Sequence, residues 1–195
     1  MPFYFDYACP WAYMGSCRVE AYFADLGIEV DFRPIHLATA REATAGQAPA
    51  PGERKSRWFA ADIQAWSELT GADLDTSPRH LIQRSTRLAL AAALVAKDAG
   101  RFREFHYPAY RARWAQARDL SEREVVRELL AGAGLDAEAA LARAESPELG
   151  ERLDRETADA MARGVFGVPT VFVGDRMFWG NDRFELARFF LEKAR

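Results

Sequence analysis

Cys9 is the residue with the clearest potential for chemistry in this chain of 195 residues. It stands directly before Pro10, and proline is favoured at the first position of a helix, where its missing N–H group would be unpaired anyway. The unpaired N–H groups and the dipole of a helix N-terminus favour a negative charge, so we expect Cys9 to react as the thiolate. The alternative hypothesis is a small buried hydrophobic residue, the commoner role of a cysteine.

A resolving thiol for Cys9 is missing at the usual spacing. The third residue after Cys9 is Ala12, so there is no Cys-x-x-Cys pair. Cys17 follows eight residues after Cys9, and eight residues of helix span about 12 Å, whereas a disulfide needs Cα atoms within about 7 Å. We therefore expect Cys9 to form at most a mixed disulfide with an external thiol, and Cys17 to be a packing residue.

The elements expected around Cys9 form a β-α-β unit. The aromatic segment Phe3–Tyr7 predicts a strand. A helix follows to about Leu26, where the apolar residues still recur at helical spacing. Ile28–Phe32 alternates apolar and charged residues, which predicts a second strand that Pro34 ends. A crossover of this kind is right-handed and gives a parallel pair of strands.

The C-terminal elements complete this sheet. A helix over about 147–163 precedes a Gly-rich segment, a strand, a turn at Gly174-Asp175 and a second strand. A final helix begins near Asn181 or Asp182, which are good N-cap residues. The hairpin adds an antiparallel pair, so the predicted fold is α/β, with a mixed four-stranded sheet and helices on both faces.

The middle of the chain predicts an all-helical insertion into this sheet domain. Residues 38–53 are rich in Ala, Pro, Gly and Thr and are expected to form a loop, and residues 55–144 are mostly helical in pattern. We assign residues 1–37 and 147–195 to the sheet domain and residues 38–146 to the insertion.

Composition excludes several classes of protein. Hydrophobic residues make up 49% and charged residues 28% of the chain, with a net charge of −3, so a disordered chain or a general nucleic-acid binder is not expected. The longest apolar run is Leu88–Ala96, far short of the about 20 residues of a membrane span. His36, His80 and His106 lack the spacing of metal ligands, so no metal site is expected. No signal peptide is visible, which favours the cytoplasm.

Two ends of the sequence resemble a known family. Phe3–Tyr13 is similar to the opening of the DsbA-like thioredoxin superfamily. Gly164–Thr170 and Phe178–Arg183 more specifically resemble 2-hydroxychromene-2-carboxylate isomerases, relatives of the kappa-class glutathione transferases, with a weaker match at Asp62–Trp66. The resemblance implies a thioredoxin-like fold with a helical insertion, a homodimer and glutathione as cofactor. It also implies isomerisation of a small aromatic carboxylate from aromatic-compound degradation, in which the glutathione thiolate adds to a double bond and leaves after rotation.

The resemblance also assigns the site residues. Cys9 stands where the family has a serine that steadies the glutathione thiolate. Val168-Pro169 matches a cis-proline turn whose strand-like backbone would bind the cysteinyl part of glutathione. Asn181 and Asp182 match positions that hold its γ-glutamyl end, with helix capping as the simpler alternative. Pro10 and Trp11 would line the same pocket, with core packing as the simpler alternative.

The cysteine at position 9 keeps other functions open. Cys9 can donate an S–H hydrogen bond only weakly, but it can be oxidised onto glutathione, which a serine cannot. The alternative function is therefore a monothiol glutathione-dependent oxidoreductase, transferase or peroxidase. A second alternative is a non-catalytic binding protein that keeps the fold.

Two cations and an aromatic cluster are weaker candidates for binding substrate. Lys55 and Arg84 could pair with the carboxylate of a substrate or of glutathione, although a solvated helix face is the simpler interpretation. The large aromatic residues of the insertion are expected to be mostly core, with part of them roofing an aromatic pocket. They are Trp58, Trp66, Phe102, Tyr107, Tyr110 and Trp114.

Overall fold

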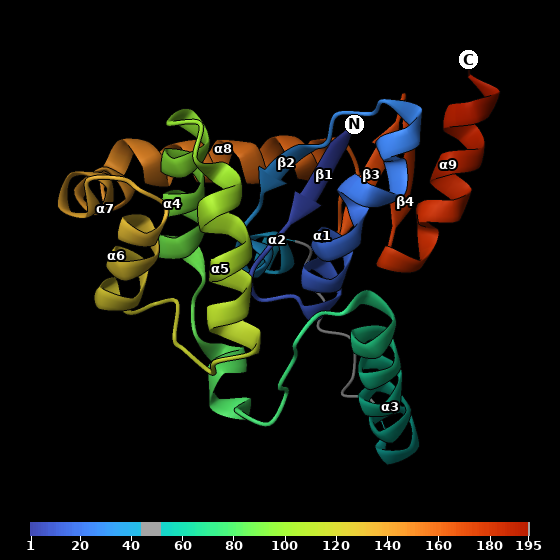
Figure 1. Cartoon of the computed structure of the whole chain (residues 1–195), viewed down its shortest axis with the longest axis horizontal. Helices are drawn as coiled ribbons and strands as arrows, with labels where there is room; N and C mark the ends of the chain where they lie inside the picture. The colour runs from blue at the N-terminus through green and yellow to red at the C-terminus, as the bar shows by residue number, and fades with distance from the viewer. Residues whose placement is uncertain (44–51, 195) are drawn as a thin grey trace.

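A mixed sheet is built by the two ends of the chain (Figure 1). In this computed structural model, which describes residues 1–43 and 52–194, the strands run in the order β2-β1-β3-β4. β1 pairs parallel with β2 and antiparallel with β3, which pairs antiparallel with β4. The strands are β1 (Pro2–Phe5), β2 (Asp31–Pro34), β3 (Thr170–Val173) and β4 (Arg176–Trp179). The predicted mixed sheet is confirmed.

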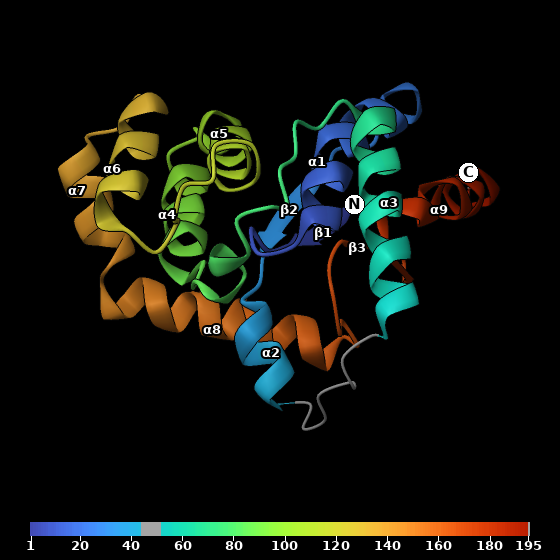
Figure 2. The same cartoon turned by 90° about the horizontal axis from the view of Figure 1, so that it is seen from below.

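Helices cover both faces of the sheet. In Figure 2, α1 (Pro10–Phe23) and α9 (Phe184–Lys193) lie on one side of the strands and α8 (Pro147–Ala162) on the other. Pro10 is the first residue of α1 and Cys9 is its N-cap, as the sequence predicted. The helix ends slightly earlier than predicted, because a 3-10 turn over Ala24–Leu26 follows it before the left-handed Gly27. This arrangement is the predicted thioredoxin-like fold.

The segment between the strands is helical. Four helices, α4 to α7, pack together on one side of the sheet, whereas α3 lies beside α1, away from them (Figure 2). The elements of this segment are α2 (Leu37–Ala43), α3 (Glu53–Thr70), a 3-10 turn (Arg79–Gln83), α4 (Arg87–Asp98), α5 (Phe102–Trp114), α6 (Arg123–Gly132) and α7 (Ala137–Ala144). The division into a sheet domain and an insertion over 38–146 stays a prediction.

The prediction of a loop over 38–53 is wrong for residues 38–43, which belong to α2. The N–H group of Leu37, at the start of α2, donates to the buried carboxylate of Asp6 at 2.8 Å, and Ala40 is buried. A tertiary cap and a buried face therefore stabilise a helix that composition alone did not indicate. Residues 44–51 of the predicted loop lie outside the described residues.

Strand β2 lies further along the chain than predicted. It covers Asp31–Pro34 instead of 28–32, and Pro34, which pairs with Phe5, is its last residue. Proline is tolerated here because β2 is an edge strand, where one row of backbone groups makes no ladder bonds.

Among the helices described over 1–43 and 52–194, none is both long and apolar enough to cross a membrane.

Candidate functional site

Cys9 lies where β1 leads into α1, next to the segment that precedes β3. Its backbone N–H donates to the carbonyl of Asp6 at 3.1 Å, and its Sγ–H donates to the carbonyl of Val168, also at 3.1 Å. The Val168–Pro169 peptide bond is cis, as the resemblance implied. The structure thus brings together two motifs that are 159 residues apart in the sequence.

Asp6 organises the loop that carries Cys9. Its carboxylate is buried and accepts hydrogen bonds from the Ala8 N–H at 2.9 Å, the Thr86 hydroxyl at 2.6 Å and the Leu37 N–H at 2.8 Å. These donors come from the loop itself, the start of α4 and the start of α2. One carboxylate therefore fixes the Cys9 loop to both neighbouring helices.

A glycine on α1 allows the helix to approach the cis-proline. A Cβ atom at Gly15 would lie 3.3 Å from Cγ of Pro169 and 3.4 Å from the ring of Phe3. This spacing is tighter than ordinary van der Waals contact, so a larger residue would push Pro169 away from α1. Gly15 thereby helps to keep Val168 within hydrogen-bond distance of Cys9.

A cleft of about 570 Å³ opens between α3 and the β3–β4 end of the sheet. It contains five of the seven residues that the sequence assigned to catalysis or cofactor binding, all except Cys9 and Pro10. Cys9 adjoins the cleft because its Sγ–H group is hydrogen-bonded to the carbonyl of Val168. The cleft is lined by Trp11, Trp58, Phe59, Asp62, Trp66, Val168, Pro169, Trp179, Gly180, Asn181, Asp182 and Arg183.

Polar groups converge on the cleft at the turn after β4. Asn181 is only 3% exposed, and its Nδ2 has no hydrogen-bond partner among the residues described. Asp182 is half exposed and pairs with Arg183 at 3.4 Å. The N–H of Gly180 donates to the carbonyl of Pro169 at 2.9 Å, which joins this turn to the cis-proline. A buried amide donor without a partner is unusual, which makes Asn181 a candidate donor to a ligand in the cleft.

Aromatic side chains form two opposite walls of the cleft. Trp58, Phe59 and Trp66 come from α3, and Trp58 is 59% exposed. On the other side Trp179 is 52% exposed and packs edge-to-face on Phe166, with ring centroids 4.9 Å apart. Exposed tryptophans in a concave site are typical of binding surfaces for flat apolar ligands.

The aromatic cluster predicted from the sequence is divided between cleft and core. Trp58 and Trp66 line the cleft, whereas Tyr110 and Trp114 are buried. Five lining residues were not predicted from the sequence, namely Phe59, Asp62, Trp179, Gly180 and Arg183. The spacing of Phe59, Asp62 and Trp66 at i, i+3 and i+7 places them on one face of a helix, and this was the signal that could have found the α3 wall.

Comparison with known proteins identifies the family. Residues 1–192 match the family described as DSBA-like thioredoxin domain. The chain is similar to a 2-hydroxychromene-2-carboxylate isomerase of Pseudomonas putida (32% identity, covering 98% of this chain and 92% of that protein). A protein of the same name from Sphingobium xenophagum is 29% identical, covering 97% and 96%. The chain belongs to the DsbA-like thioredoxin family, in its 2-hydroxychromene-2-carboxylate isomerase branch.

Solved structures agree with this family. The chain matches the structure of a 2-hydroxychromene-2-carboxylate isomerase with a TM-score of 0.82 at 25% identity, covering 99% of this chain and 94% of that one. It matches a probable DsbA oxidoreductase of Streptomyces coelicolor with a TM-score of 0.79 at 25% identity, covering 99% and 88%. The thioredoxin-like fold with its helical segment is therefore shared along almost the whole chain.

The two predicted substrate cations of this DsbA-like protein lie in different places. Lys55 is exposed on α3, and its ammonium lies 5.7 Å from the ring centre of Phe59, so it sits at the edge of the cleft. Arg84 pairs with Asp119 at 3.0 Å and lines a separate cavity of about 400 Å³. The structure does not bring Arg84 together with the cleft.

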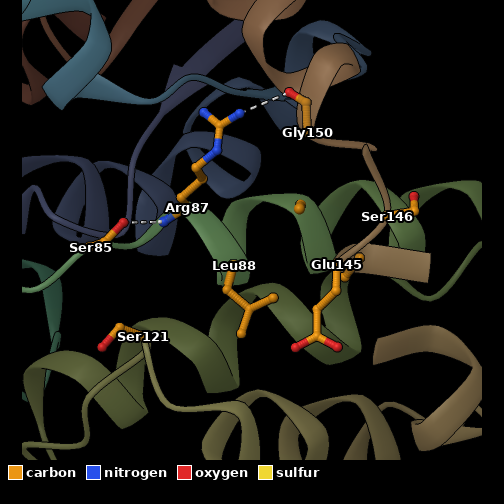
Figure 3. Close-up of a pocket in the computed structure, with 9 residues that line it drawn as sticks. Ser85, Arg87, Leu88, Ser121, Glu145, Ser146 and Gly150 are labelled. Atoms are coloured by element: carbon orange, nitrogen blue, oxygen red, sulfur yellow. Dashed lines mark hydrogen bonds between the residues drawn. The ribbon is translucent and has the colours of Figure 1, made fainter. Parts of the chain in front are cut away.

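Another cavity of about 340 Å³ lies among the helices of the DsbA-like fold (Figure 3). Figure 3 shows Arg87 at its rim, where the guanidinium donates to the carbonyl of Gly150. Arg87 also pairs with Asp154 at 2.6 Å, so its charge is already compensated. Within 1–43 and 52–194, no group of three or more His, Cys, Asp or Glu side chains could hold a metal ion. The cleft beside Cys9 is therefore the candidate site.

Behind Cys9, this DsbA-like protein has a buried polar chain. The ring of His106 shares hydrogen bonds of 3.2 Å with the Tyr7 hydroxyl at Nδ1 and with the Ser16 hydroxyl at Nε2. Burial, and secondarily the charge of Arg103, lowers the pKa of His106 well below its usual value of 6.5. Burial raises the pKa of Tyr7 well above its usual value, so its hydroxyl stays neutral.

The second cysteine takes no part in this site. Cys17 is exposed, so the prediction that it is a packing residue is wrong. Neither Cys9 nor Cys17 is part of a disulfide.

Proposed function

We propose that this protein is a glutathione-dependent isomerase that acts on a small aromatic carboxylate. The observation that carries the proposal is the cleft that joins Val168-Pro169 to Asn181 between aromatic walls, directly beside Cys9. Relatives that match almost the whole chain are named 2-hydroxychromene-2-carboxylate isomerase. Their name gives the substrate class that we propose here.

The cleft residues fit glutathione by chemical type. The unpartnered Nδ2 of Asn181 would donate to the γ-glutamyl carboxylate, and Asp182 would accept from the ammonium group. The backbone of Val168 would pair with the cysteinyl residue in the manner of a strand. Pro10, as the first residue of α1, and Trp11 would close the end of the cleft near Cys9.

The catalytic role that we propose for the chain is to orient and polarise. When bound, glutathione supplies a thiol that adds reversibly to a carbon–carbon double bond. The Sγ–H of Cys9, which donates to the Val168 carbonyl, lies at a helix N-terminus where an anionic sulfur would be stabilised. Trp58, Trp66 and Trp179 would hold the aromatic ring of the substrate and exclude water from it.

The test is a comparison of Cys9→Ser with Cys9→Ala. Since the family has a serine at this position, the proposal expects Cys9→Ser to keep isomerase activity with 2-hydroxychromene-2-carboxylate. Cys9→Ala should lower kcat by about 10- to 100-fold, because no hydrogen-bond donor remains at this position. Calorimetry with glutathione on the wild type should show saturable binding. A wild type without any binding would contradict the proposal.

A second candidate function is favoured by Cys9 itself. A thiol at a helix N-terminus beside the cleft could exchange with oxidised glutathione, forming the Cys9–glutathione disulfide and releasing one reduced glutathione. The protein would then be a monothiol glutathione-dependent oxidoreductase, transferase or peroxidase. This hypothesis expects Cys9→Ser to abolish activity, and mass spectrometry to find a glutathione adduct on Cys9. Absence of turnover with any thiol would instead indicate a non-catalytic binding protein.

We further propose a cytoplasmic homodimer as the working form. A chain with two cysteines in 195 residues carries no disulfide framework, which fits a compartment that keeps thiols reduced. Leu186 and Phe189 on α9 are about half exposed, and this apolar surface fits a subunit contact. Light scattering of the purified protein measures the oligomeric state directly, and a monomeric mass at micromolar concentration would contradict the dimer.

A further inference from the structure

Arg18 on α1 lies among three aromatic rings. Its guanidinium carbon is 5.1 Å from the ring centre of Tyr22, 5.2 Å from that of Phe184 and 5.5 Å from that of Trp66. One of its N–H groups donates to the backbone carbonyl of Asn181 at 3.4 Å. Within the described part of the chain, Arg18 has no carboxylate at ion-pair distance, so the rings and this carbonyl are what its charge faces.

These contacts reach both sides of the proposed glutathione cleft. Trp66 belongs to the α3 wall, and Asn181 carries the unpartnered amide on the opposite side. Phe184 begins α9 directly after the turn that contains Asn181. Arg18 itself does not line the cleft, but it touches one lining residue from each side.

Helix α3 depends on α1 for its position. Figures 1 and 2 both show α3 beside α1 and separate from the helices α4 to α7. α1 is the main element that α3 packs against. At the C-terminal end of α3, the hydroxyl groups of Ser67 and Thr70 donate to carbonyl groups of the helix and its end. The position of the aromatic wall is therefore set by the contact with α1, where Arg18 and Trp66 meet.

We propose that Arg18 is a positioning residue that fixes the distance between the two walls of the cleft. Its cation attracts the face of Trp66 on one side, and its N–H group holds the Asn181 backbone on the other. The Asn181 amide and the α3 aromatic rings are thereby preorganised toward one ligand. This inference rests on the proposed function for the identity of that ligand, but the link between the walls does not.

Arg18→Met tests the role with a side chain of similar length and no charge. We expect faster hydrogen–deuterium exchange in α3 of the free protein, because its wall loses the cation. We also expect the KM for glutathione to rise about tenfold with kcat changed less than about twofold, since a ligand must then order the cleft itself. Arg18→Lys, which keeps a cation near the rings, should recover part of both effects.

Arg163→Met is the matched control. Arg163 also lies over a ring, with its guanidinium carbon 3.9 Å from the ring centre of Phe172, and donates to the backbone carbonyl of Gly174 at 2.9 Å. It is not a lining residue of the cleft. We expect Arg163→Met to leave both the exchange of α3 and the KM for glutathione unchanged.

The two measurements separate this inference from the proposed function. Unchanged α3 exchange in Arg18→Met, or an equal rise of KM in Arg163→Met, would overturn the positioning role. If the wild type does not bind glutathione, the proposed function fails, and the exchange experiment on the free protein alone decides the role of Arg18. Faster exchange of α3 in Arg18→Met, but not in Arg163→Met, would support the positioning role in that case also.

Discussion

The two sides of Cys9 are built in opposite ways. Behind it, the polar atoms of Tyr7, His106 and Ser16 satisfy one another in a chain of buried hydrogen bonds. In front of it, the amide of Asn181 is buried with no partner among the residues described, and Trp58 is 59% exposed. The first region is packed and its polar atoms are paired, as in a protein core. The second region has an unpaired polar group and exposed apolar surface.

The difference indicates that the buried side stabilises the structure and that the cleft is suited to bind a ligand. Buried polar groups are stabilising only when they are fully paired, so the region behind Cys9 can hold the loop over 6–9 in one conformation. Unpaired donors and exposed rings cost stability in the free protein and gain partners when a ligand binds. The loop thus receives its rigidity from the core and its chemistry from the cleft.

The largest effect is expected from the paired side, at Asp6. Asp6→Ala removes the acceptor of three hydrogen bonds, from Ala8, Thr86 and Leu37, and leaves these donors buried or half-buried. We expect a loss of about 3 kcal/mol or more in the free energy of unfolding, measured by urea denaturation. Thr86→Val is the control, because it removes one of the three donors and should cost about 1 kcal/mol. Equal losses in the two variants would contradict the central role of Asp6.

The resemblance predicted the open side of the site better than the paired side. Val168, Pro169 and Asn181 line the cleft as predicted, whereas Asp6 and Ser16 were not predicted to have a role.

The meeting of Cys9 with Val168 was implied by the resemblance, because the β-α-β pattern and the hairpin give two pairs of strands but not the pairing of β1 with β3. In contrast, Phe59 and Asp62 share a helical face, but helical spacing does not say whether that face meets the core or a cleft. The docking of α3 against α1 decides this, and docking depends on contacts far apart in the sequence.

Two errors in the fold have the same origin. The strand predicted over 28–32 lies over Asp31–Pro34, because its pairing with β1 extends as far as Pro34 at the edge of the sheet. Residues 38–43 lack a local helix signal, and the helix forms because Asp6, far away in the sequence, caps Leu37. In both places tertiary contacts override the local pattern, which a single sequence cannot show.

On the open side, Gly180→Ala should disturb the cleft. Gly180 has a φ of 114°, a conformation that L-residues rarely adopt, and a Cβ atom there would overlap Oδ1 of Asp182. We expect a loss of about 1–3 kcal/mol of stability together with weaker glutathione binding in calorimetry. Gly174→Ala is the control, since Gly174 has a φ of 58° and no atom within 4 Å of such a Cβ. It should lose stability but keep the affinity, and an equal loss of affinity would speak against the Asp182 contact.

The pH dependence of the free energy of unfolding tests the buried side in the wild type, where the hydrogen bonds of His106 are intact. The pKa of His106 is lowered in the folded protein, mainly by burial. Below a pH of about 6.5 the unfolded chain therefore takes up a proton that the folded protein does not. We expect the free energy of unfolding to fall as pH drops from 7 toward 5, more steeply in the wild type than in His106→Phe. Parallel pH profiles of the two proteins would show that His106 is not the group responsible.

The smallest effect is expected at Arg113, a residue of the buried side whose polar atoms are not all paired. This side chain is 2% exposed and donates to the carbonyl of Leu81, but Nε and Nη1 have no partner within the described ranges. Burial lowers the pKa of Arg113, and the charges of Asp119 and Asp6 offset this only in part. Replacing such a charge by an apolar side chain of similar size is often neutral or stabilising. Arg113→Met should therefore change the free energy of unfolding by less than about 1 kcal/mol, or raise it.

Arg113→Lys separates charge from packing in the same experiment. It keeps a buried cation but cannot make the planar contacts of a guanidinium. If the charge is uncompensated, the order of stability by urea denaturation is Met above Lys at position 113. The reverse order would mean that the cation is stabilised where it lies, most directly by Asp119 and Asp6, whose charges raise the pKa of Arg113 against the effect of burial. The charge of Arg113 would then be compensated by neighbouring carboxylates, and the buried side of Cys9 would differ from the cleft in this respect also.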